Sequence, residues 1–159
     1  MDVFDKEILS FWKALQENSV QYIMVGGYAI NLHGFQRFTS DLDIWLNDTP
    51  DNRKALRNAL ADCAMGDYPP IENMQFLPGW TEFILNNGLR LDVLTNMKGL
   101  EQYTFDECLQ MASVADIEGV SVPFLHINQL IENKKVINRP KDQIDINALE
   151  EIKKLREDS

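Results

Sequence analysis

The sequence predicts a mixed α/β (α+β) domain, with a small mixed β-sheet flanked by helices and a helical tail at the C-terminus. Three observations predict this class. Apolar segments of strand length alternate with helical patterns in the first part of the chain, two later segments carry hairpin signals, and the end of the chain has helical periodicity. The chain has 159 residues, of which 45% are hydrophobic, so it can fill the core of one domain.

The predicted elements of the first half follow from apolar spacing and from cap residues. Gly34 is a natural left-handed stop for the second helix, and Thr49-Pro50 is a typical helix start. In chain order we expect a helix through Ile8, Phe11, Trp12 and Leu15 capped by Asp2 or Asp5, a strand at 21–25, a helix at 28–33, a strand at 42–46, and a helix that presents Leu56, Leu60 and Cys63.

The second half predicts two hairpins and two helices. Asn86-Asn87-Gly88 is a turn sequence between strands expected at 81–85 and 89–94, and Glu118-Gly119 joins strands expected at 114–117 and 120–123. Helices are expected at 127–136 and at 141–155, the latter opened by Pro140. We therefore expect a single domain over residues 1–159, with a core at about 20–125 and C-terminal helices at about 126–156.

Composition excludes several classes of protein. No apolar run reaches the roughly 18–20 residues that span a bilayer, and the start MDVFDKEILS lacks the features of a signal peptide. Cys63 and Cys108 form no metal-binding pattern with either histidine, so we expect reduced thiols in a cytoplasmic protein. The net charge of −10 argues against broad adhesion to nucleic acid or to a membrane.

Two motifs between residues 22 and 46 indicate a site. Gly26-Gly27 follows a predicted strand, where paired glycines let a phosphate approach the backbone amides. Asp41 and Asp43 open the next strand, where residues two apart share one face and can hold one divalent ion together. Together they suggest a site for a metal–nucleotide complex.

Asp92 is the third acidic candidate. In the strand expected at 89–94, Leu89, Leu91 and Val93 alternate, so Asp92 points to the opposite face. Convergence of Asp92 with the other two acids would be costly, because two charges about 4 Å apart repel by roughly 4 kcal/mol at an effective dielectric near 20. A divalent cation or a bound proton would relieve that cost.

The combination of a glycine pair, Asp41-x-Asp43 and a later lone Asp92 resembles the DNA polymerase β-like nucleotidyltransferase superfamily. The longer string from Gly26-Gly27 through His33-Gly34-x-x-Arg37-x-Thr39 to the two acids looks like its minimal bacterial and archaeal members, which include relatives of abortive-infection toxin and antibiotic nucleotidyltransferases. Lys134 followed by Arg139-x-Lys141-Asp142-x-x-Asp145 is similar to the tail signature of that group. The resemblance covers residues 22–149.

The resemblance implies the nucleotidyltransferase fold and transfer of a nucleoside monophosphate from a nucleoside triphosphate (NTP), bound with two Mg²⁺ ions, to an acceptor hydroxyl. Asp41, Asp43 and Asp92 would be catalytic and would hold the metals. The nucleotide would be bound by Gly26, Gly27, Arg37, Thr39, Lys134, Lys141 and Asp145. The acceptor could be a small molecule, a protein side chain or an RNA end, and a homodimer is left open.

A helical wheel of the tail can be compared with that signature. Ile144, Ala148, Leu149, Ile152 and Leu155 mark a predicted core stripe, and Lys141 and Asp145 fall inside it. Lys134 likewise extends the stripe of Ile127, Leu130 and Ile131. Ionisable residues on an inward face form a buried ion pair or a pocket wall.

Each feature also has an ordinary explanation. A glycine pair is often only a turn, two acids at a strand edge are often solvated, and Asp92 could be an exposed hairpin residue. Lys141 and Asp145 could be a structural pair one helical turn apart. Two other functions therefore stay open: a catalytically silent nucleotide-binding or toxin–antitoxin partner of the same fold, and a structural domain with an acidic edge.

Overall fold

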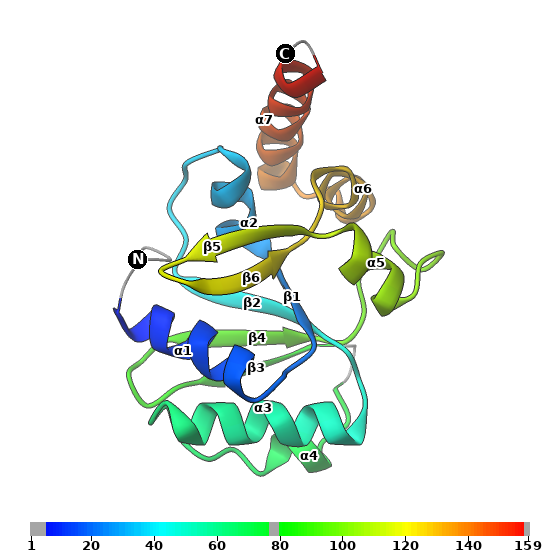
Figure 1. Ribbon diagram of the computed structural model, residues 1–159. Helices are drawn as coiled ribbons and strands as arrows, with labels where there is room; N and C mark the ends of the chain where they lie inside the picture. The colour runs from blue at the N-terminus through cyan, green and yellow to red at the C-terminus, as the bar shows by residue number, and fades with distance from the viewer. Residues whose placement is uncertain (1–5, 77–79, 158–159) are drawn as a thin grey trace.

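The computed structural model describes residues 6–76 and 80–157, and shows one six-stranded sheet with helices around it (Figure 1). The strand order is β3-β4-β2-β1-β6-β5. The strands are β1 (Tyr22–Val25), β2 (Asp41–Leu46), β3 (Trp80–Ile84), β4 (Arg90–Leu94), β5 (Ser113–Ile117) and β6 (Val120–Phe124). This architecture confirms the predicted mixed α/β class.

The helices are α1 (Lys6–Glu17), α2 (Gly26–His33), α3 (Pro50–Asp62), α4 (Pro70–Asn73), α5 (Phe105–Met111), α6 (Ile127–Ile137) and α7 (Pro140–Glu157). In Figure 1, α3 and α4 lie at the bottom of the molecule, and α6 and α7 lie at the top. The sequence did not predict α4 or α5. Asp2 and Asp5, the expected caps of α1, lie outside the described residues.

Local capping explains where several helices begin. The Thr49 hydroxyl accepts a hydrogen bond from the Asn52 amide at 3.2 Å, with Pro50 at the first helical position of α3. Thr104 and Glu107 form a reciprocal capping box at the start of α5. At α6, His126 Nδ1 accepts a hydrogen bond from the Asn128 amide at 3.1 Å, so this histidine caps the helix.

The sheet is mixed because the chain both turns back in hairpins and crosses over. The hairpin pairs β3–β4 and β5–β6 are antiparallel, as is β1–β2. In contrast, β2 pairs in parallel with β4, and β1 pairs in parallel with β6. The parallel pairing of β2 with β4 matters most, because it sets the two strands that carry the predicted acids side by side.

The two faces of these central strands differ. Leu42, Ile44, Leu91 and Val93 are fully buried and belong to the hydrophobic core, together with residues of α1 and α3. The alternate positions of the same strands carry the predicted acids, which are only half-buried. Alternation along the strands therefore places the candidate chemistry on the face away from the main core.

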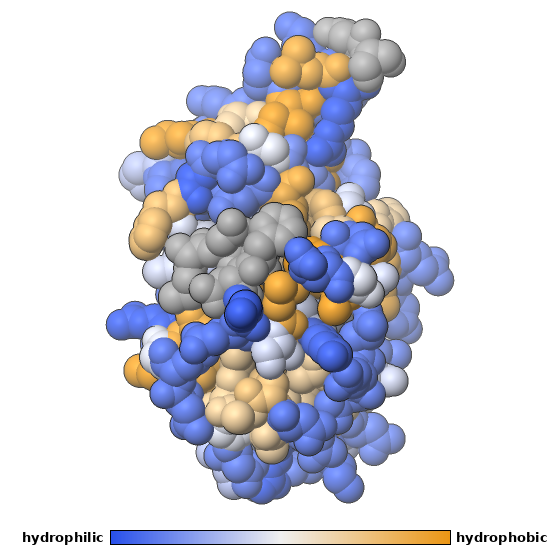
Figure 2. Space-filling view, turned by 60° about the vertical axis from the view of Figure 1, so that its left-hand side comes forward, coloured by the Kyte–Doolittle hydropathy of each residue, from blue (hydrophilic) through white to orange (hydrophobic). Residues whose placement is uncertain are grey.

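The predicted core stripe of α7 is partly wrong. Leu149 is fully buried, and Ile152 is half-buried and packs near Gly34, but Ile144 and Leu155 are 63% and 62% exposed. Figure 2 shows apolar side chains along this helix at the surface. The helix turns a different face inward, formed by Asp142, Asp145, Ile146 and Leu149, so buried carboxylates replace apolar residues.

No helix within the described ranges has both the length and the apolar character needed to cross a membrane. Cys63 and Cys108 are both free thiols, and Cys108 is buried.

Candidate active site

A row of carboxylates crosses three adjacent strands. Asp43 of β2 is the register partner of Asp92 in β4, and Asp92 is in turn the register partner of Glu82 in β3. Directly opposite residues of neighbouring strands point to the same face of a sheet. Asp41 lies two residues before Asp43 and shares that face. The structure therefore brings together all three predicted acids and adds a fourth.

Burial and mutual repulsion disfavour the charged forms of the central pair. Burial, the hydrogen bond and repulsion from Asp92, and the nearby charge of Asp41 raise the pKa of Asp43 to about 8, while the positive charge of Lys134 opposes this. Burial, with the charges of Glu82 and Asp41, also raises the pKa of Asp92. The central carboxyl groups therefore favour the protonated form unless a cation neutralises the cluster.

Glu82 was missed from the sequence. Its side chain is about one-third exposed, and it lies 4.0 Å from the Arg90 guanidinium in a loose ion pair. The hairpin turn that was identified at Asn86-Asn87-Gly88 sets the register that places residue 82 opposite Asp92. That register could have identified Glu82.

The glycine pair lies directly beside this row. Val25 is the register partner of Asp43, and α2 begins with the next residue. Gly26 has φ of +71°, and a Cβ there would overlap the Asp43 carboxylate. A Cβ on Gly27 would lie 2.5 Å from Thr39 Oγ1 and 3.5 Å from an Arg37 terminal nitrogen. Only glycine leaves room at both positions.

The start of α2 also offers backbone donors. Its N-cap is Val25, which makes no side-chain hydrogen bond to the first turn. The first N–H groups of a helix have no partner within the helix, and they favour an anion such as phosphate. Thr39 and Arg37 lie beside Gly27, so a hydroxyl and a positively charged side chain accompany the helix start.

A network of ion pairs holds the predicted cationic side chains of Arg37 and Lys134 in place. Arg37 Nη1 lies 3.1 Å from each carboxylate oxygen of Asp145, and Lys134 Nζ lies 3.0 Å from Asp145 and 3.2 Å from Asp142. Arg139 also binds Asp142, with Nε at 2.8 Å. Asp142 and Asp145 are at most 1% exposed. Three cations against two carboxylates leave this network with one positive charge.

Hydrogen bonds from Arg139 and Lys134 outweigh the effect of burial and hold the pKa of Asp142 well below its ordinary value. Asp142 belongs to the tail motif but is not among the predicted site residues. Arg37 keeps a buried Nε without a hydrogen-bond partner among the described residues. This arginine therefore retains an unused donor.

The structure confirms some of the predictions for the C-terminal tail and contradicts others. Asp145 lies on the inward face as expected, and Lys134 is buried with Ile127, Leu130 and Ile131 as expected. Lys141 is exposed, so its placement in the inward stripe is wrong. Asp145 pairs instead with Arg37 and Lys134. The one-turn pair of Lys141 with Asp145 is therefore replaced by long-range pairs to other elements.

The donor set fits a divalent cation that is bound jointly by protein and substrate. No three His, Cys, Asp or Glu side chains of the described residues form a ready cage for a metal. However, Asp92 Oδ1 is buried and has no hydrogen-bond partner in that part of the chain. Mg²⁺ is typically held by one or two carboxylates together with substrate phosphates. The carboxylate row lies beside a helix start of the kind that favours phosphate, so the residues present fit such an ion.

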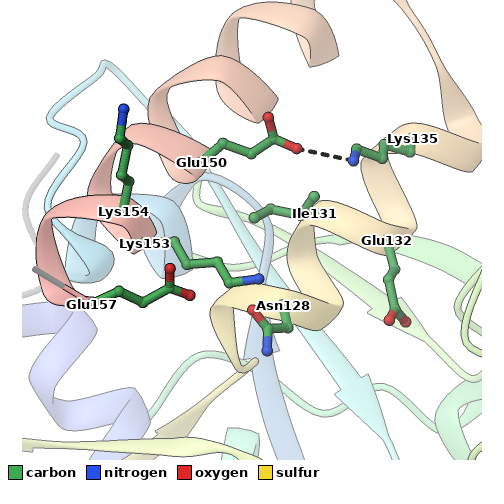
Figure 3. A pocket seen from close by; sticks show the side chains of 8 residues that line it. All are labelled: Asn128, Ile131, Glu132, Lys135, Glu150, Lys153, Lys154 and Glu157. Carbon is green, nitrogen blue, oxygen red and sulfur yellow. Dashed lines mark ion pairs between the residues drawn. The ribbon is translucent and has the colours of Figure 1, made fainter.

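Two surface hollows lie elsewhere. A groove of about 420 Å³ between α6 and α7 is lined mainly by Lys and Glu side chains, with Lys135 and Glu150 paired at 2.9 Å (Figure 3). None of the predicted site residues lines it. A pocket of about 340 Å³ lies at the C-terminal end of β2, beside Trp45 and Phe105.

These features define a nucleotidyltransferase-type fold whose candidate site combines strand carboxylates with a glycine-led helix start. The family described as "Nucleotidyl transferase of unknown function (DUF2204)" matches residues 5–158, and the chain belongs to it. This confirms the resemblance that the motifs predicted. No curated protein sequence matches the chain significantly.

Solved structures show the same fold at low identity. The lincosamide antibiotic adenylyltransferase LnuA, solved with lincomycin, superposes with a TM-score of 0.65 at 17% identity, covering 96% of this chain and 99% of LnuA. ANT(2")-Ia, solved with adenylyl-2"-tobramycin, gives 0.57 at 19%, covering 94% and 92%. An antigenic nucleotidyltransferase-like protein from Paracoccidioides brasiliensis gives 0.57 at 18%, covering 94% and 73%.

Proposed function

We propose that this protein transfers a nucleoside monophosphate from a Mg²⁺-bound NTP to an acceptor hydroxyl and releases pyrophosphate. The observation that carries the proposal is the register match of Asp43 with Asp92 beside the start of α2. Family membership and the fold shared with antibiotic adenylyltransferases support the reaction class.

The glycine-led helix start suits the triphosphate. Amides of the first turn of α2 donate to the β- and γ-phosphates, because Gly26 and Gly27 carry no side chain of their own between the backbone and the ligand. Thr39 adds a hydroxyl beside them. Arg37 and Lys134 supply positive charge, and Asp142 and Asp145 hold both cations in place. In this arrangement Asp145 acts through its cations rather than by touching phosphate.

Asp41, Asp43 and Asp92 are proposed to hold the divalent ions. When bound, these ions polarise the phosphoryl group and stabilise the attacking and leaving oxygens. The acceptor oxygen forms a bond to the α-phosphorus, and the bond from that phosphorus to the pyrophosphate oxygen breaks. Asp92 takes the hydroxyl proton, so charge and atoms balance. Its unpartnered Oδ1 is free to accept that proton.

The test is transfer of α-labelled NTP in the presence of Mg²⁺, with pyrophosphate release followed in parallel. Asp41→Asn, Asp43→Asn and Asp92→Asn should each reduce transfer to background while the folded protein persists in circular dichroism. A silent nucleotide-binding module would bind NTP and release no pyrophosphate. Full activity in the Asp43 and Asp92 variants would refute the assignment.

A further inference from the structure

The pocket at the C-terminal end of β2 lies on the same strand face as the acids. Trp45, which lines it, is two residues beyond Asp43 and therefore points to the same side. At about 3.3 Å per residue, the two positions are roughly 7 Å apart. The pocket volume of about 340 Å³ is in the range of small-molecule sites.

The pocket wall opposite β2 is formed by the segment that follows β4, and this segment is attached to the helix that carries Lys134. Residues 95–103, several of which line the pocket, follow β4 directly. This segment is fastened to α6 by a 2.7 Å hydrogen bond from Asn133 Nδ2 to the Lys98 carbonyl. Lys134, the next residue of α6, is close enough for its charge to act on Asp43. Pocket and carboxylate row therefore share one side of the sheet.

The pocket lining combines aromatic surface with negative charge. Trp45 and Phe105 meet edge to face with centroids 5.4 Å apart, and Tyr103 adds a third ring. No Lys or Arg is among the lining residues. Asp48 is neutralised by Arg53 at 2.6 Å, whereas Glu101 is exposed and has no ion pair within the described ranges. Aromatic faces and an uncompensated carboxylate both attract a cation.

We propose that this pocket is the acceptor subsite and that the acceptor is a small, hydroxyl-bearing cation. The proposal rests on the nucleotidyl transfer proposed above and selects among the acceptors that the sequence left open. An RNA end is disfavoured, because the pocket has no basic residue and because Lys134 and Arg139 are engaged by Asp142 and Asp145. The protein's net charge of −10 favours the approach of cations as well.

The experiment uses the full chain with α-labelled ATP, Mg²⁺ and three acceptor pools from a cell extract. These are total RNA, total protein, and a small-molecule ultrafiltrate separated by cation exchange. Label is expected in the retained, cationic small molecules. The variant Glu101→Arg should raise the KM for that pool about tenfold with little change in kcat, and Tyr103→Ala should raise it as well. The control Glu151→Arg makes the same charge change on an exposed face of α7 and should alter neither constant.

A thermal shift by Mg²⁺ with a non-hydrolysable ATP analogue separates the two proposals. If the shift is present but label enters RNA, protein or anionic small molecules, or enters no pool, the acceptor subsite is refuted and nucleotide binding stands. Equal KM values for wild type, Glu101→Arg and Tyr103→Ala refute the subsite too. If neither shift nor label is found, the proposed function itself fails.

Discussion

Replacement of Asp145 by alanine tests whether the buried ion network holds the cations of the site. Asp145 is 1% exposed, and its carboxylate receives both Arg37 and Lys134. Removal of one partner from a buried ion pair costs about 3–5 kcal/mol, because a charge is left uncompensated. Arg37 is 31% exposed and can be rehydrated, and Lys134 keeps Asp142 as a partner. We therefore expect Asp145→Ala to lower the free energy of unfolding by the lower end of this range, about 3 kcal/mol.

Urea unfolding measured by circular dichroism gives this loss directly, and for a chain of this size the melting temperature should fall by about 6–12 °C. Glu17→Ala is the matched control, because Glu17 pairs with Lys13 at 3.9 Å with both side chains more than 60% exposed. That exposed pair should contribute less than about 1 kcal/mol. A loss below about 1 kcal/mol for Asp145→Ala, equal to the control, would refute the reasoning.

Two further predictions concern the helix start and the carboxylate row. Gly27→Ala places a methyl group against Thr39, so this variant should lose fold stability and should lose Mg²⁺–NTP binding measured by calorimetry. Combining it with Thr39→Gly removes the crowding and should restore fold stability. Normal nucleotide binding by the single variant would contradict the crowding argument. The pKa of Asp43 is raised to about 8, so without metal its contribution to stability is complete below about pH 4 and is lost as the pH rises through 8. Melting temperatures in EDTA should therefore fall over this interval more steeply for wild type than for Asp43→Asn; identical slopes would contradict it.

Patterns within single elements predicted much of this fold. Short apolar segments identified the strands, and Asn86-Asn87-Gly88 identified the hairpin that sets the β3–β4 register. Patterns within single elements could not predict the pairing of β2 with β4, because strand order depends on long-range packing. The expectation that β2 and β4 are neighbours came from the resemblance to nucleotidyltransferases, and the structure places Asp43 opposite Asp92.

The tail shows where sequence periodicity fails. Ile144 and Leu155 fit an apolar stripe, yet both are exposed, and the helix buries Asp142 beside Asp145, of which only Asp145 was predicted to face inward. Partners far away in sequence decide this, since Arg37 reaches Asp145 from a loop 108 residues earlier. A helical wheel counts hydrophobicity and cannot register such compensation. Apolar spacing alone therefore predicts the wrong face wherever a buried ion network replaces hydrophobic packing.

The central claim is that divalent ions and a nucleotide meet at the carboxylate row beside α2. The most direct measurement is anomalous diffraction from crystals soaked with Mn²⁺ and a non-hydrolysable NTP. We expect manganese peaks between β2 and β4 in contact with Asp41, Asp43 and Asp92, with two ions about 3.5–4 Å apart and the phosphates at Gly26 and Gly27. Manganese bound only elsewhere, or phosphates remote from the start of α2, would contradict the account.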